Sequence, residues 1–89
     1  MINVKILKVV KRETHPTSHR IVYLLESGCG RWFTCSIAPD DIVLTEGNIL
    51  NHEIGVRWIT DAGDKINISP SHFLSSKEEA ETRFSELMS

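Results

Sequence analysis

The sequence lacks any long uninterrupted apolar segment. Lys5, Lys8 and Lys11 interrupt the apolar residues near the N-terminus, so no secretory signal or membrane-spanning run is present. Internal repeats and low-complexity segments are also missing. At 89 residues the chain has room for one domain and none for a second, catalytic one. We therefore expect a single cytoplasmic domain over residues 1–89 with no membrane association.

Cysteine is scarce, with only Cys29 and Cys35. If residues 30–37 form a strand, their Cα atoms lie roughly 20 Å apart at ~3.3 Å per residue. A disulfide needs a Cα separation of about 4.4–6.8 Å, so no internal bridge is expected. Two unpaired thiols agree with a reducing compartment.

Sequence motifs of catalysis are absent as well. There is no Gly-x-Ser-x-Gly turn, phosphate-binding loop, dinucleotide glycine pattern or His-Glu-x-x-His helix. Cys29 lies between two glycines and is the one candidate nucleophile, with His15 or His19 as its base. A hairpin turn explains the same glycines and is the favoured interpretation. We predict no catalytic residue and a protein that is not an enzyme.

Metal-ligand spacing is incomplete. His15 and His19 have a separation seen in zinc sites, but Pro16 places them in a loop and no Cys-x-x-Cys pair accompanies them. The other candidate ligands are Cys29, Cys35, His52 and His72. The Asp61–Asp64 segment lacks the alternating oxygen ligands of a calcium loop. We predict no metal and no cofactor.

The net charge of −2 excludes the strongly basic composition of a dedicated duplex-binding protein. This average hides an uneven distribution. Residues 1–36 carry six basic and two acidic side chains, a net +4, whereas residues 37–89 carry four basic and ten acidic ones, a net −6. A charge split of this kind favours oriented docking or head-to-tail self-association over diffuse attraction to phosphate.

The first 37 residues predict a three-stranded meander. Strands are expected at 2–11, 19–26 and 31–37, because β-branched and aromatic residues alternate there between turn signals. The change of face at Ile6 and Leu7 predicts a β-bulge in the first strand. Alternation in the second strand places His19, Ile21, Tyr23 and Leu25 on one face.

Residues 38–53 give no clear pattern, and at 42–47 a helical turn and a short strand are equally compatible with the sequence. A β-hairpin is predicted over 54–69. Its first strand, 54–60, places Ile54, Val56 and Trp58 on one face, and a turn at 61–64 leads to a return strand at 65–69 with Ile66 and Ile68 inward.

The C-terminal segment predicts a helix over about 76–88. Ser75 and Ser76 each precede a glutamate by three residues, which is the spacing of a capping box. Ala80, Phe84 and Leu87 form one apolar stripe. The fold class is therefore mainly β (α+β): a small five-stranded OB-like or SH3-like barrel, or a curled antiparallel sheet, with a C-terminal α-helix.

Trp32 shares its strand face with Thr34 and Ser36, so two placements are open for its indole. It is either exposed beside Arg31, or packed under the helix stripe against Phe84. Aromatic residues and arginine contribute much of the binding energy at interfaces, and an acidic surface suits a basic partner.

We therefore predict a non-enzymatic module that docks to another protein, with homo-oligomerisation as a further form. A regulator or stoichiometric inhibitor of a larger basic protein is one such function. The predicted partner-binding residues are Trp32, Arg31, Glu78, Glu79 and Glu81.

The alternative function is binding of single-stranded nucleic acid, which combines a cationic groove with aromatic stacking. The residues predicted for that face are Lys5, Lys8, Arg20, Tyr23, Trp32 and Trp58.

Overall fold

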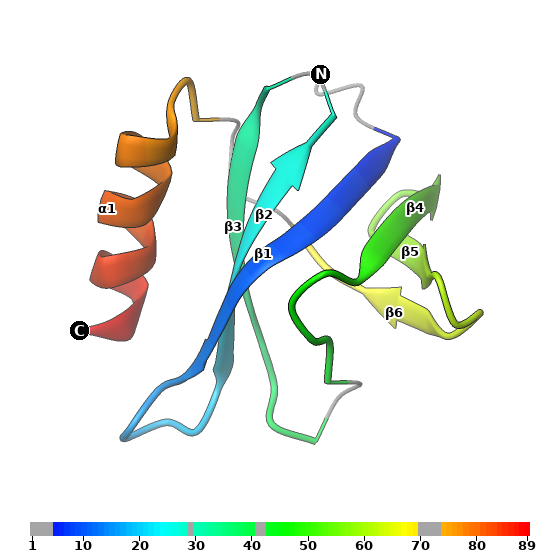
Figure 1. The fold of residues 1–89 in the computed structure, drawn as a ribbon. Helices are drawn as coiled ribbons and strands as arrows, with labels where there is room; N and C mark the ends of the chain where they lie inside the picture. The colour runs from blue at the N-terminus through cyan, green and yellow to red at the C-terminus, as the bar shows by residue number, and fades with distance from the viewer. Residues whose placement is uncertain (1–4, 29, 41–42, 70–73) are drawn as a thin grey trace.

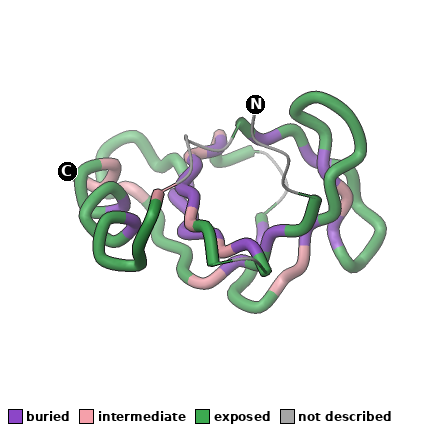
Figure 2. The backbone as a smooth tube through the Cα atoms, turned by 90° about the horizontal axis from the view of Figure 1, so that it is seen from above, coloured by how far each residue is buried: buried purple, intermediate pink, exposed green. Residues whose placement is uncertain are grey.

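The computed structural model describes residues 5–28, 30–40, 43–69 and 74–89. The elements found there are β1 (Ile6–Thr14), β2 (Ile21–Ser27), β3 (Trp32–Ile37), β4 (Ile49–Ile54), β5 (Arg57–Thr60), β6 (Lys65–Asn67) and α1 (Lys77–Met88). The strands form one antiparallel sheet of order β3-β2-β1-β4-β5-β6. This sheet curls into a half-barrel, and α1 lies outside the curl (Figures 1 and 2). The predicted mainly β fold with a C-terminal helix is confirmed, as a curled sheet.

β1 lies in the middle of the sheet and joins its two halves. It pairs with β2 on one side and with β4 on the other. Leu7 and Val9 are buried in the interior of the curl. The bulge is at Val9–Lys11 and not at the predicted Ile6–Leu7. The reason is that Val10 packs toward α1 and the Lys11 ammonium lies 4.9 Å from the centre of the Phe84 ring.

β1 also extends to Thr14, where the sequence predicts a loop from residue 13. Glu13 and Thr14 pair with Val22 and Ile21 of β2 and so continue the ladder. The predicted N-terminal part of this strand, residues 2–4, lies outside the described residues. The connection to β2 is a tight turn in which the His19 N–H donates to the His15 carbonyl oxygen at 3.0 Å.

β2 is buried on both faces, because it separates two apolar clusters. Ile21, Tyr23 and Leu25 face the interior of the curl. Val22 and Leu24 face α1, where they meet Ala80 and Phe84 in the cluster that we call the helix cluster. The alternation predicted for this strand is therefore confirmed from Ile21 on. His19 was expected on the same face, but it lies before the strand with a φ of +61°.

Residues 54–60 do not form the single predicted strand. The chain reverses at Gly55, whose φ of +54° lies in the left-handed region that glycine adopts without strain. β4 ends at Ile54 and β5 begins at Arg57, so the sheet has six strands rather than five. Trp58 is buried, whereas Ile54 and Val56 are 68% and 49% exposed, so the three residues do not share a face.

The predicted turn at 61–64 is confirmed by a hydrogen bond from the Thr60 N–H to the Asp64 carbonyl oxygen at 2.8 Å. Ile66 and Ile68 face the interior as expected. In the segment before β4, residues 43–47 form neither of the two structures considered, and residues 41–42 lie outside the described part. The Gly47 N–H and the Asn48 carbonyl instead bond to Val9.

α1 begins after Ser76, as predicted. The Ser76 hydroxyl accepts a hydrogen bond from the Glu79 N–H at 3.2 Å, and Glu79 Oε2 accepts one from the Ser75 N–H at 2.9 Å. These contacts complete a capping arrangement. Ala80 and Phe84 are buried against β2 and β3. Within the described part of the chain, no helix has the length and apolarity needed to cross a bilayer.

Candidate functional site

An open groove of about 490 Å³ runs along α1 and the segment that precedes it. Its walls come from two parts of the chain: the extended residues before the helix and the solvent-facing side of the helix itself. The lining residues are Leu74, Ser75, Ser76, Glu78, Glu79, Thr82, Arg83 and Glu86. We call this feature the α1 groove. Three carboxylates and one guanidinium give it a negative charge, which attracts cationic side chains.

The three carboxylates differ in how far they are already engaged. Glu79 accepts hydrogen bonds from the backbone N–H and the hydroxyl of Ser75, at 2.9 and 2.8 Å. These bonds lower the pKa of Glu79, the backbone bond contributing most. Glu86 lies 3.6 Å from Arg83 in an exposed ion pair. The Glu78 carboxylate has no hydrogen bond or ion pair to the described residues, and it is therefore the most available anion of the α1 groove.

Trp32 contacts the α1 groove through Leu74, one of the residues that line it. Its N–H and carbonyl exchange hydrogen bonds with Leu74 at 3.2 and 2.8 Å. Its half-buried indole packs against the helix cluster, together with Leu74 and Leu87. Of the two placements that the sequence allows, the structure therefore has the one under the helix. Trp32 fixes the position of Leu74 and does not line the groove.

The remaining predicted docking residues are distributed differently. Glu81 is exposed on α1 but lies outside the groove lining. Arg31 is exposed just before β3, where its backbone pairs with that of Ser27 at 2.8 Å. Glu78 and Glu79 are therefore the two predicted residues that the structure brings together in the groove.

The residues predicted for a nucleic-acid face are divided between the interior and the surface. Tyr23 and Trp58 are buried in the curl, with exposed fractions of 0% and 5%. The Arg20 guanidinium bonds to the hydroxyl and the carbonyl oxygen of Ser36, both at 2.9 Å. Lys5 and Lys8 are exposed. A base cannot stack on an aromatic ring that is enclosed by the core, so these residues form no continuous stacking surface.

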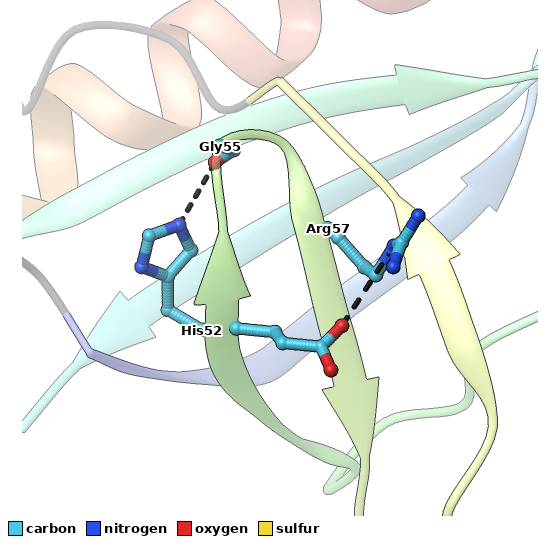
Figure 3. Close-up of polar contacts among 4 residues, drawn as sticks. His52, Gly55 and Arg57 are labelled. Carbon is cyan, nitrogen blue, oxygen red and sulfur yellow. Dashed lines mark hydrogen bonds and ion pairs between the residues drawn. The ribbon is translucent and has the colours of Figure 1, made fainter.

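The β4–β5 hairpin is a second organised surface, and the sequence analysis did not find it (Figure 3). His52 donates a hydrogen bond from Nε2 to the Gly55 carbonyl oxygen at 2.8 Å, and its ring centre lies 4.9 Å from that of Trp58. Glu53 and Arg57 form an ion pair at 3.7 Å. The available signal was Gly55, since a lone glycine within a strand pattern marks a break.

Those groups considered for chemistry that the structure describes do not form a cluster. Cys35 is buried, and burial raises the pKa of its thiol to about 12. The nucleophile candidate Cys29 and the ligand candidate His72 lie outside the described residues. Among the residues described, no three His, Cys, Asp or Glu side chains gather as a metal site would require.

No protein-family model matches the chain, and comparisons with curated proteins and with solved structures give no match either.

Proposed function

We propose that this protein is a non-enzymatic docking module that binds a basic segment of a partner protein in the α1 groove. The observation that carries the proposal is the groove itself, whose lining combines the carboxylates of Glu78, Glu79 and Glu86 with the aliphatic side chain of Leu74. An extended peptide with lysine or arginine side chains matches this charge, and an aliphatic side chain matches Leu74.

A protein partner agrees better with the charge distribution than a nucleic acid does. The acidic groove repels phosphate. Several basic residues of the N-terminal half also have internal roles: Lys11 lies over Phe84, and Arg12 donates to the Leu44 carbonyl oxygen at 3.2 Å. In this account the protein acts stoichiometrically, as a regulator or inhibitor of a larger basic protein in the cytoplasm.

The proposal is tested with a fluorescein-labelled peptide of alternating lysine and leucine, titrated with the protein at low salt. We expect saturable binding that weakens about tenfold in the double variant Glu78→Lys/Glu86→Lys, because the groove then changes sign. Glu79 is left intact, since its carboxylate also caps α1.

The matched control is Glu13→Lys/Glu46→Lys, which changes the net charge equally at two exposed positions outside the groove. Circular dichroism checks that α1 persists in both variants, because Glu78→Lys opposes the helix dipole. Equal loss of affinity in the two double variants would show that only net charge matters and would contradict a site in the α1 groove.

A further inference from the structure

The outer face of the curled sheet is covered unevenly. α1 packs over β2 and β3, whereas none of the described elements packs on the outer side of β4, β5 and the Ile6–Lys8 part of β1 (Figure 1). Residues opposite one another in an antiparallel pair project to the same side. The register places Ile6, Asn51 and Ile59 in one row, Lys8 and Ile49 in a second, and Ile54 and Arg57 in a third.

Four isoleucines thus lie on one side of three neighbouring strands. Ile6 and Ile54 are 51% and 68% exposed, and Ile49 and Ile59 are half-buried. We call Ile6, Ile49, Ile54 and Ile59 the isoleucine face. The exposed Asn51 lies between Ile6 and Ile59, so the four isoleucines surround one polar side chain. Exposed aliphatic residues that gather on one side of a sheet are typical of an interaction site, whereas scattered single residues are not.

Basic side chains border the isoleucine face. Lys8 is opposite Ile49 on one side, and Lys65 is opposite Ile59 on the other. Neither ammonium forms an ion pair with the residues that the structure describes. Arg57 lies at a third edge, where it pairs with Glu53 at 3.7 Å. Glu26 of β2 is opposite Lys8 on the side away from the isoleucines and is half-buried. The occupant of this face therefore meets aliphatic side chains around Asn51, with lysines at two of its margins.

Another part of the outer face of this sheet already binds an amphipathic helix of the chain itself. α1 is an acidic amphipathic helix that packs on the adjacent part of the outer face through Ala80 and Phe84. Lys11 borders that contact and lies over the Phe84 ring. The isoleucine face likewise combines aliphatic side chains with a lysine border, and no helix in the described part of the chain packs on it.

We propose that the isoleucine face binds an amphipathic helix of a partner protein whose apolar stripe is flanked by acidic side chains. This inference goes beyond the proposed function, because it concerns a different surface and a partner of opposite charge. A second copy of the chain is a poorer occupant, since the apolar stripe of its own α1 is already buried.

The test uses a synthetic amphipathic helix of roughly 18 residues with leucines at i, i+3, i+4 and i+7 and glutamates beside them. The comparison peptide carries lysines in place of the glutamates. We expect the acidic peptide to bind at least about tenfold more tightly than the basic one, and Lys8→Glu/Lys65→Glu to reverse that preference.

Two substitutions separate the apolar contribution from charge. Ile6→Thr/Ile54→Thr keeps β-branched side chains in both strands and should weaken binding of the acidic peptide about tenfold. The matched control is Val43→Thr, an aliphatic residue of similar exposure (48%) outside the face, which should change the dissociation constant less than about twofold. Glu78→Lys/Glu86→Lys should leave binding of the acidic peptide intact. Failure of this test can therefore be told apart from failure of the test of the α1 groove.

Three results would overturn the inference. The first is equal binding of the acidic and basic peptides, and the second is equal loss in the isoleucine variant and in Val43→Thr. The third is concentration-dependent dimerisation in sedimentation that disappears in Ile6→Thr/Ile54→Thr, which would assign the face to a second copy of the chain.

Discussion

The Tyr23 hydroxyl connects the segment before β4 to the interior of the curl. It accepts a hydrogen bond from the Leu44 N–H at 2.9 Å, while the Leu44 carbonyl oxygen accepts one from Arg12 Nη1 at 3.2 Å. Leu44 is buried, so its backbone groups need these partners. The side chains of Tyr23 and Arg12 thus provide the hydrogen bonds that a neighbouring strand would give to the Leu44 backbone in a sheet.

Tyr23→Phe removes the hydroxyl and leaves the Leu44 N–H without this acceptor. We expect the free energy of unfolding to fall by about 1–3 kcal/mol, the cost of a buried donor that loses its partner. Urea denaturation followed by tryptophan fluorescence measures the change. A loss below about 0.3 kcal/mol would show that the bond contributes nothing net.

The buried thiol of Cys35 should be protected from modification in the folded protein. Burial raises the pKa of its thiol to about 12, so the native protein keeps the neutral form that does not react with disulfide reagents. In a Cys29→Ser background at pH 8, we expect Cys35 to be modified only as fast as the protein unfolds. Rapid stoichiometric modification of the folded protein would contradict its burial.

The raised pKa of Cys35 also makes the stability of the protein depend on pH. Because the pKa of Cys35 is higher in the folded protein than in the unfolded chain, its contribution to stability is complete below the unfolded pKa. The contribution is lost as the pH rises from the ordinary value of 9.0 toward about 12.

At the scale of elements, sequence signals were most informative where local chemistry alone decides the structure. Ser76 and Glu79 define the start of α1 through contacts within four residues, and the prediction there is confirmed. The β4–β5 turn was missed because Gly55 interrupts an otherwise continuous alternation from Ile54 to Thr60. The reversal follows from the antiparallel pairing of β4 with β5, in which Ile54 is opposite Arg57, and local alternation does not contain that pairing.

The helix cap provides a prediction for α1. Ser76→Ala removes the hydroxyl that accepts from the Glu79 N–H, and we expect a loss of about 1 kcal/mol in the free energy of unfolding. Ser85→Ala is the matched control, because Ser85 is exposed in the helix interior where alanine is favourable. Equal stability of the two variants, measured by urea denaturation, would show that Ser76 does not cap the helix.

In the whole molecule, many of the acidic and the basic residues lie on different surfaces. The acidic residues of α1 form one wall of a groove, whereas several basic residues bond to the sheet or border its two apolar outer surfaces. Alternation correctly separated the two sides of β2, but it could not show what covers each side. Trp32 is an example: its face was predictable, but the helix over it depends on contacts more than 40 positions apart in the chain.

Binding of a basic segment in the α1 groove should change the amide chemical shifts of the residues that line it. Titration of the ¹⁵N-labelled protein with the alternating lysine–leucine peptide should shift the signals of Ser75, Ser76, Thr82 and Arg83. In Glu78→Lys/Glu86→Lys the same shifts should need about tenfold more peptide, in line with the weaker binding expected of that variant. Shifts confined to other residues, or reached at the same peptide concentration in that variant, would contradict binding in the α1 groove.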